Sequence, residues 1–299
     1  MPLVSAVIPA YNAARFLGDA VRSVLEQTGA DVEVIVVDDG STDGTRDVAD
    51  GFGRAIQYVR QQNQGIAGAR NTGLGQCTGD YVGFLDADDT WLPGKLRRQL
   101  AALAREPGVR AVHSACMVVD AELRPIAVQA SPRSASTLED LVLLGNVVGS
   151  VCSLLVERKL LAAVGGFNST FSHCADWEFA IRLARHTEFA YVPEPLVTYR
   201  QHGANLSRQI DTLERESTCL IEMTLSEPGL PPSVVRRANE ARARNWMALA
   251  GCYFNASRYR DFARCAHRAL RLQPASLTRL LGFPVRRLTG QSDWRRRFW

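Results

Sequence analysis

Residues 80–91 read DYVGFLDADDTW. The first half, residues 81–85, is a short apolar run rich in strand-forming side chains, which predicts a buried β-strand. Three carboxylates follow at once, at Asp86, Asp88 and Asp89. Ligands of open α/β sheets bind beyond the carboxyl ends of the strands. The stretch therefore predicts a buried strand that ends at a ligand site.

The three carboxylates suggest a bound cation. Carboxylates this close repel one another unless a cation or hydrogen-bond donors lie among them. An Asp-x-Asp pair offers the hard oxygen ligands that Mg²⁺ or Mn²⁺ prefers, with coordination positions left for substrate phosphates. From this stretch alone, a solvated acidic turn in which Asp89 or Thr90 caps the next helix is an equal alternative.

The chain before this stretch alternates between strand and helix patterns. Strands are predicted at residues 3–9, 33–37 and 55–59, and helices at residues 13–27, from about 45 to 52, and in the small-residue stretch 63–73. This spacing is typical of βαβ units and predicts an α/β fold with a mostly parallel sheet. Right-handed crossovers place the ends of the second and fourth strands at the same edge. The pair Asp38-Asp39 should therefore face the same cleft as Asp86 and Asp88.

The first loop excludes two common classes of nucleotide-binding protein. Residues 9–12, PAYN, stand where a dinucleotide-binding domain carries Gly-x-Gly-x-x-Gly, and no Gly-x-x-x-x-Gly-Lys-Ser/Thr occurs in the chain. Arg70, in the middle of the third predicted helix, would reach a diphosphate with its fork of donors. Its alternative role is that of a surface arginine paired with a carboxylate.

Four motifs follow one another along the first third of the chain: VIPAYN at residues 7–12, VVDDGSTD at 36–43, GARN at 68–71 and LDADD at 85–89. Together they resemble the family 2 glycosyltransferases, inverting enzymes of the GT-A fold. The resemblance covers about residues 1–208. It implies a Rossmann-like mixed, mostly parallel sheet flanked by helices, and an enzyme that uses a nucleotide-diphosphate sugar with Mg²⁺ or Mn²⁺.

The resemblance implies a donor-binding role for nine residues: Pro9, Ala10, Tyr11, Asp38, Asp39, Arg70, Asp86, Ala87 and Asp88. The first three would line the nucleotide pocket. Asp39 would hydrogen-bond the base, with Asp38 beside it, and Arg70 would hold the donor. The Asp-x-Asp element would contact the ribose and the metal-bridged diphosphate, with the metal held mainly by Asp88 and with Asp86 nearby. Asp89 is expected to cap the following helix instead.

Two later motifs complete the resemblance. Residues 174–178, CADWE, match the element that carries the family's catalytic base at Asp176, although many relatives have an acidic residue just before it. In the first turn of a helix the dipole favours the ionised carboxylate, which suits a group that accepts a proton. Glu178 is expected to point elsewhere on the helix. In residues 199–207, YRQHGANLS, His202 would bind metal or phosphate, or else be a loop histidine held by hydrogen bonds.

The second half is predicted to turn from mixed to helical. Further strands are expected at residues 109–119, 126–128 and 151–156, and a short helix at 138–144. We place the domain boundary between a catalytic domain, residues 1–208, and a helical C-terminal extension, residues 209–299. The extension is basic: residues 211–299 carry 16 Lys and Arg against 8 Asp and Glu, while the whole chain has a net charge of +4. Residues 245–269 resemble one tetratricopeptide-type helical hairpin, which cannot form a solenoid alone.

The composition of the chain indicates where in the cell the protein is expected and which partners it is expected to bind. Seven scattered cysteines without metal-like spacing favour the cytoplasm, and no apolar run approaches the length of a membrane span. The end of the chain mixes basic and aromatic residues, which favours either peripheral attachment to an anionic membrane face or a solvated terminus. No nucleic-acid motif accompanies the basic residues, so we expect no nucleic-acid partner.

The sequence therefore predicts a glycosyltransferase that acts on a glycan or glycolipid acceptor, in the synthesis of bacterial surface polysaccharide or glycolipid. Two alternatives stay open. A sugar-phosphate nucleotidylyltransferase uses a related sheet, but its Gly-rich first loop is absent here. A non-catalytic relative would bind donor or partner proteins, and the intact set of aspartates argues against it.

Overall fold

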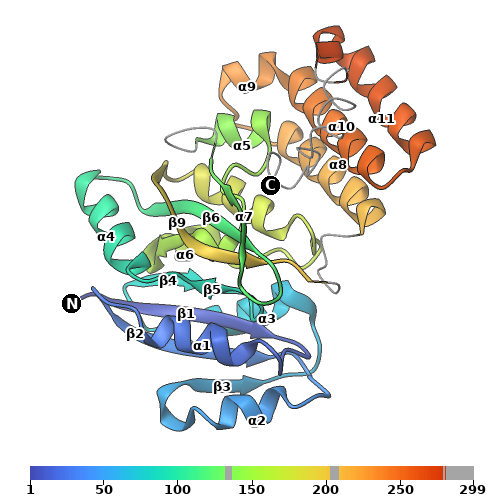
Figure 1. Ribbon diagram of the computed structural model, residues 1–299. Helices are drawn as coiled ribbons and strands as arrows, with labels where there is room; N and C mark the ends of the chain where they lie inside the picture. Colours follow the sequence, from blue (N-terminus) through green and yellow to red (C-terminus); the bar gives the residue numbers. More distant parts are fainter. Residues whose placement is uncertain (132–136, 203–208, 279, 281–299) are drawn as a thin grey trace. The chain divides into compact units, whose positions relative to one another are not determined.

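The computed structural model describes residues 1–131, 137–202, 209–278 and 280 of the 299-residue chain (Figure 1). The chain divides into two compact units. The sheet unit holds Met1–Ser136 and Val148–Gly203, and the helical unit holds Thr137–Val147 and Ala204–Trp299. The short segment at residues 137–147, which the sequence analysis placed in the first domain, thus joins the helical unit.

The sheet unit is built on a mixed sheet of nine strands. They are β1 (Leu3–Ala10), β2 (Asp31–Asp38), β3 (Gln57–Arg60), β4 (Tyr81–Phe84), β5 (Thr90–Trp91), β6 (Ala111–Val119), β7 (Pro125–Gln129), β8 (Leu155–Glu157) and β9 (Phe189–Arg200). The strand order is β3-β2-β1-β4-β8-β6-β9-β5, and β7 pairs with β6 outside this path. The first four strands in this order pair in parallel, and antiparallel pairing begins between β4 and β8.

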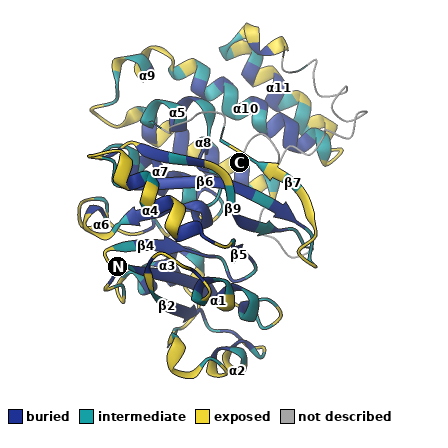
Figure 2. Ribbon diagram, turned by 60° about the vertical axis from the view of Figure 1, so that its left-hand side comes forward, coloured by how far each residue is buried: buried dark blue, intermediate teal, exposed yellow. Residues whose placement is uncertain are grey.

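Helices flank this sheet, which confirms the predicted α/β class. They are α1 (Leu17–Leu25), α2 (Thr45–Asp50), α3 (Gly65–Leu74), α4 (Lys95–Arg105), α6 (Arg158–Val164) and α7 (Ala175–Ala184), with 3-10 turns η1 (Gly53–Ala55) and η2 (Val151–Ser153). The central strands are buried, whereas β7 at the margin is half-exposed (Figure 2). Parallel pairing brings the carboxyl ends of β2, β1 and β4 to one edge, as the crossover argument predicted.

Helix α3 lies against the sheet because its residues are small. A Cβ atom at Gly73 would lie 2.3 Å from Cγ1 of Val7 on β1, so only glycine fits there. Ala69 packs in the same buried cluster as Ile35 and Val37 of β2. This close approach fixes where the intervening Arg70 side chain begins.

Three local predictions from the sequence were wrong. The first helix begins at Leu17 instead of residue 13, because the preceding backbone amides donate to side chains of residues 41–45. The strand predicted at residues 151–156 is the turn η2 followed by β8. Helix α4 begins at Lys95 after Gly94, whose φ of +76° favours glycine, and no side chain caps it, so Asp89 is not its cap.

The helical unit confirms the predicted change to helices after residue 209. It contains α5 (Leu138–Leu144), α8 (Ile210–Ser226), α9 (Pro232–Arg236), α10 (Ala238–Asn255), α11 (Tyr259–Leu272) and the turn η4 (Pro274–Ser276). Helix α5 belongs here because Val142 and Leu143 share a buried cluster with Val234 and Ala241. Helices α10 and α11 form the predicted hairpin.

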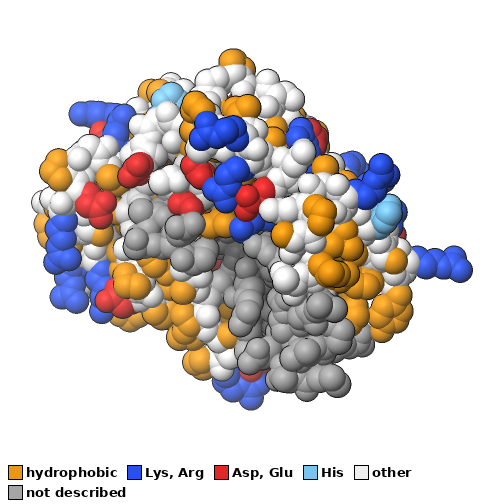
Figure 3. Space-filling view, turned by 90° about the horizontal axis from the view of Figure 1, so that it is seen from above, with side chains coloured by type: hydrophobic (Ala, Val, Ile, Leu, Met, Phe, Trp, Pro, Cys, Tyr) orange, Lys and Arg blue, Asp and Glu red, His pale blue; other side chains and the backbone are white. Residues whose placement is uncertain are grey.

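Ion pairs link helix α8 to α11 and to the residue before it. Arg264 forms two hydrogen bonds with Glu214, at 2.6 and 2.7 Å, and Arg258 pairs with Asp211 at 2.7 Å. On the face drawn in Figure 3, basic and acidic side chains lie next to one another. Among the residues the structure describes, no helix has the length and apolar character needed to cross a bilayer. The basic residues 281–299 lie outside the described residues.

Candidate active site

The turn that follows β4 sends its three carboxylates in different directions. The Leu85 amide donates to Val7 on β1, and the Asp89 amide closes the turn on the carbonyl of Asp86 at 3.0 Å. Ala87 is buried within this turn. The side chain of Asp86 reaches helix α3, that of Asp88 reaches the segment after β9, and that of Asp89 points into the protein.

Arg70 joins two of the predicted site residues. Its Nη2 donates to Oδ1 of Asp86 at 2.8 Å, and its Nη1 donates to Oδ1 of Asp176 at 2.6 Å. The Arg70 side chain is 2% exposed, and its guanidinium lies 5.1 Å from the ring centre of Phe167. The neighbouring residue Asn71 holds that segment through two hydrogen bonds with the Phe167 backbone. The guanidinium is therefore buried between two carboxylates in a fixed position.

Asp176 lies in the first turn of α7, as predicted. Its Oδ1 accepts from Arg70, and its Oδ2 accepts from the Val151 amide at 3.1 Å. Burial raises the pKa of Asp176; the charge of Arg70 opposes this shift and the charge of Asp86 adds to it, so the pKa stays above its usual value. A carboxylate with a raised pKa binds a proton more firmly, which is what a general base near neutral pH needs.

Asp88 is paired with a histidine. Its Oδ2 lies 2.9 Å from Nε2 of His202, whose ring packs on Phe16 at a centroid distance of 5.0 Å. Burial raises the pKa of Asp88 and the nearby charge of Asp86 adds to the shift, while the contact with His202 opposes it. Carboxylate oxygens are the ligands that Mg²⁺ and Mn²⁺ prefer, and a divalent cation relieves the repulsion between neighbouring carboxylates. The metal role of Asp86 and Asp88 stays a prediction, because Asp86 is directed to Arg70 and Asp88 to His202 in the structure.

The Asp38-Asp39 pair lies at the end of β2, on the same edge of the sheet. Oδ1 of Asp39 accepts from the Gln61 side chain at 2.7 Å and from the Gln64 amide at 2.8 Å. Asp38 faces inward, where it accepts from the Ser41 amide and the Tyr58 hydroxyl. Burial raises the pKa of Asp38, but these hydrogen bonds outweigh it and leave the pKa below its usual value.

The end of β1 brings the first-loop residues to the same edge. Pro9 and Ala10 are buried strand residues, and the carbonyl of Ala10 accepts the Asp39 amide at 2.8 Å. Tyr11 follows them and is 54% exposed. An exposed ring beside the buried aspartate pair is a surface on which a planar base can stack.

The predicted residues thus fall into two contact groups. One joins Arg70, Asp86 and Asp176 by direct hydrogen bonds, and it continues through the acidic turn to Asp88 and His202. The other links Ala10 and Asp39 through the backbone. Glu178 belongs to neither, because it is 7% exposed and paired with Arg182 of the same helix at 2.6 Å.

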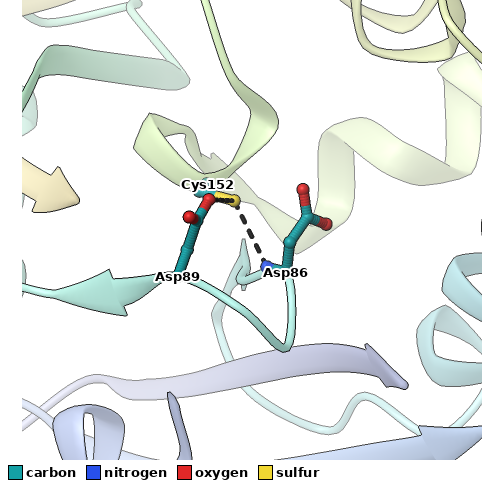
Figure 4. A group of neighbouring side chains, drawn as sticks. All are labelled: Asp86, Asp89 and Cys152. Carbon is teal, nitrogen blue, oxygen red and sulfur yellow. Dashed lines mark hydrogen bonds between the residues drawn. The ribbon is translucent and has the colours of Figure 1, made fainter. Parts of the chain in front are cut away.

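One residue of the site, Cys152, was not predicted from the sequence. Cys152 in η2 lies between Asp86 and Asp89, and one ligand atom from each of the three residues lies within 4.8 Å of the others (Figure 4). The Asp86 amide donates to the sulfur at 3.2 Å, and the thiol donates to Oδ2 of Asp89 at 3.5 Å. A single cysteine 66 positions from the turn gives no sequence signal of this contact.

The sequence matches the model of one protein family and several curated proteins. The model of Glycosyl transferase family 2 matches residues 5–163. An uncharacterized glycosyltransferase of Nostoc sp. is 35% identical over 236 residues, which are 74% of this chain and 73% of the Nostoc protein. Several other curated relatives are longer, and the chain spans about two fifths of their length.

Solved structures share the fold. The mannosyltransferase PcManGT from Pyrobaculum calidifontis, in complex with GDP-Man and Mn²⁺, has a TM-score of 0.65 at 22% identity, over 98% of this chain and 85% of that one. S. aureus TarS 1–349, in complex with UDP-GlcNAc, has a TM-score of 0.61 at 14% identity, over 89% of this chain and 91% of that one. The chain spans 54% of a longer TarS chain.

Proposed function

Because the chain belongs to glycosyl transferase family 2, we propose that it moves a sugar from a nucleotide-diphosphate sugar to an acceptor hydroxyl, with inversion at the anomeric carbon. The observation that carries this proposal is the buried guanidinium of Arg70 between Asp176 and Asp86. The same arginine contacts the proposed base and the proposed metal-binding turn, which supports a shared site for the two.

Asp176 is the proposed catalytic base. Its two hydrogen bonds, from Arg70 and from the Val151 amide, leave lone pairs free on both oxygens. The Asp176 side chain is 24% exposed, so an acceptor hydroxyl can approach it. The carboxylate removes the proton as the hydroxyl oxygen attacks the anomeric carbon from the face opposite the diphosphate.

Asp86 and Asp88 would hold a divalent cation, Mg²⁺ or Mn²⁺. When bound, such a cation neutralises the negative charge that develops on the departing diphosphate. The contact with His202 fixes the direction of the Asp88 carboxylate, so His202 orients this ligand or itself binds metal or phosphate. Arg70 adds positive charge on the same side.

The second contact group is proposed to bind the nucleotide. Tyr11 offers its exposed ring, and Pro9 and Ala10 form the wall behind it. The free oxygen of Asp39 accepts from the base, whereas Asp38 supports the loop through Ser41 and Tyr58. Ala87 keeps the acidic turn narrow beside the ribose.

A donor screen tests the proposal. The purified protein is incubated with Mn²⁺ or Mg²⁺ and a panel of UDP-, GDP- and dTDP-sugars, including UDP-GlcNAc and GDP-mannose, the donors bound by the structural neighbours. We expect one donor to raise the melting temperature and to release nucleoside diphosphate slowly, only with metal. The Asp88→Ala variant is the matched control and should show neither effect.

The same screen separates the alternatives. Release of pyrophosphate from a nucleoside triphosphate with a sugar phosphate would indicate a nucleotidylyltransferase. Donor binding without turnover, with any acceptor offered, would indicate a non-catalytic relative. Transfer of a hexose to a glycan or glycolipid acceptor would support the proposed place in surface polysaccharide or glycolipid synthesis.

The organisation and the location of the protein are part of the proposal. We assign catalysis to residues 1–208 and a separate role to the helical extension at 209–299. A cytoplasmic location agrees with the seven cysteines, all of them described and none in a disulfide bond. Peripheral membrane attachment rests on the sequence of residues 281–299 alone. It is tested by liposome pelleting of the full chain against a 1–280 truncation, and equal pelleting of both would contradict it.

A further inference from the structure

Two buried side chains tie the acidic turn to the rest of the sheet unit. Asp89 is 1% exposed, and its Oδ1 accepts from the Arg200 amide, at the end of β9, at 2.8 Å. Its other oxygen accepts from the thiol of Cys152, and the Cys152 sulfur in turn accepts from the Asp86 amide. Figure 4 shows the sulfur between the two aspartates. We call these contacts the Asp89–Cys152 latch.

Each segment held by the latch also delivers a group to the site. The residue before Cys152 is Val151, whose amide binds Asp176. Two residues after Arg200 comes His202, which binds Asp88. The latch thus connects the acidic turn to the supports of both the proposed base and the proposed metal ligand.

We propose that Asp89 and Cys152 are positioning residues. They hold the acidic turn, η2 and the end of β9 in the relative positions that the sugar-transfer site requires. This inference rests on the proposed function. A hydrogen bond that involves sulfur is weak by itself. Here the sulfur makes two of them, donating to Asp89 and accepting from the Asp86 amide, and the Cys152 side chain is fully buried. Loss of the latch lets the turn move relative to Val151 and His202 without removing any group that touches substrate.

The geometry separates this role from metal binding. Asp89 and Cys152 are 1% and 0% exposed, whereas the side chains of Asp86 and Asp88 are 25% and 31% exposed. Asp89 and Cys152 therefore support the turn and leave the proposed cation to the more exposed Asp86 and Asp88.

The test compares two substitutions at one position. Cys152→Val fills a similar volume but neither donates nor accepts a hydrogen bond, whereas Cys152→Ser restores a donor and an acceptor. Cys265→Val, at another fully buried cysteine in the helical unit, is the control for burying valine in place of a thiol. Hydrogen–deuterium exchange of segments 84–91 and 195–202 reports on the latch without any ligand.

Binding is measured as Mn²⁺ affinity by electron paramagnetic resonance, with UDP and with GDP in separate titrations. For Cys152→Val we expect faster exchange in both segments and a rise of about tenfold in the apparent dissociation constant of Mn²⁺, the size typical for lost outer-shell partners of a metal site. Cys152→Ser should restore most of the slow exchange and most of the Mn²⁺ affinity. Cys265→Val should change neither the exchange of these segments nor the Mn²⁺ affinity.

Two outcomes would overturn the inference. One is unchanged exchange in both segments of Cys152→Val. The other is faster exchange with unchanged Mn²⁺ affinity, because the latch would then hold the turn without positioning the site. If the wild-type protein failed to bind Mn²⁺ in the presence of UDP and also of GDP, the proposed function would be contradicted instead. The hydrogen–deuterium exchange of Cys152→Val and Cys152→Ser would then test the latch by itself.

Discussion

Nη1 of Arg70 lies 2.6 Å from Oδ1 of Asp176, although the two residues are 106 positions apart in the chain. The other arm of the same guanidinium lies 2.8 Å from Asp86. One buried positive charge therefore balances two carboxylates that would otherwise repel each other. The position of Arg70 on α3, which glycine and alanine bring close to the sheet, makes this arrangement possible.

Replacing Arg70 should destabilise the fold as well as stop transfer. Arg70→Met keeps the apolar stem but leaves Asp86 and Asp176 without their shared partner, and breaking a buried ion pair in this way costs about 3–5 kcal/mol. We expect a loss near the lower end of that range, because the two aspartates are about a quarter exposed. The free energy of unfolding from urea titration at pH 7 is the measurement.

The matched control is Arg124→Met. Arg124 forms an exposed ion pair with Asp120, and exposed pairs contribute little to stability. Equal losses of stability in the two variants would show that Arg70 is not the buried partner described here.

Asp176→Asn should abolish transfer and keep donor binding. The amide cannot accept the proton of the acceptor hydroxyl, and loss of a general base lowers the rate by about 10²–10⁴-fold. Turnover and donor-induced thermal shift are measured on the same preparation. Near-normal turnover would refute the base assignment, and Glu178→Gln, which removes a carboxylate paired with Arg182, serves as the control.

The rate should depend on pH through Asp176. The base works in its ionised form, so kcat/KM falls as the pH drops through the pKa of this group. Burial raises that pKa above the usual value of 3.8, and Arg70 lowers it. The fall of kcat/KM on the acid side should therefore be centred above pH 3.8 in the wild type. In Arg70→Met, the residual activity should fall at a still higher pH. A fall at a lower pH than in the wild type would contradict the assignment.

Asp88→Ala and His202→Gln should weaken metal-dependent donor binding to different degrees. Asp88 is the proposed ligand, so its removal should abolish the effect of Mn²⁺ on donor affinity. His202 acts on the Asp88 carboxylate at 2.9 Å, and loss of such an outer partner costs about 10–100-fold in metal affinity. Calorimetric titration with nucleotide, with and without Mn²⁺, distinguishes the two. A larger loss from His202→Gln would make the histidine the main ligand.

Lys95 should make stability depend on pH near neutrality. Its ammonium is fully buried, donates to Gln99 and lies 4.4 Å above the ring of Trp91. Burial lowers the pKa of Lys95 from 10.5 to about 7. Above that pH the unfolded chain binds one proton more than the folded one, so the penalty for the buried charge is complete below pH 7 and fades as the pH rises towards 10.5.

Lys95→Met removes this penalty. Its gain in unfolding free energy should be larger at pH 6 than at pH 9, by about 2–3 kcal/mol, because one pKa unit corresponds to about 1.4 kcal/mol. The other lysine of the chain, Lys159, is exposed and gives the control, Lys159→Met, for which we expect no difference between the two pH values. If the gain in unfolding free energy of Lys95→Met were the same at pH 6 and pH 9, the folded protein would not bury a charged Lys95 ammonium.

The sequence predicted the sheet unit well where local patterns decide structure. Apolar runs at β1, β2 and β4 and the small residues of α3 are found as expected, because strand burial and close helix packing depend on side chains within each segment. The errors lie at segment ends. The start of α1 depends on hydrogen bonds from residues 41–45, and Asp89 accepts from Arg200, 111 positions away, instead of capping α4.

The sequence by itself determined the α/β class, the change to helices after residue 209 and the motifs that indicate the family, since these depend on residue type and on order along the chain. Only the tertiary structure decided that one guanidinium joins Asp86 to Asp176, that Cys152 lies under the acidic turn, and that helix α5 belongs to the helical unit. These contacts join residues far apart in the chain. Their partners are chosen by the packing of whole elements, which no local pattern encodes.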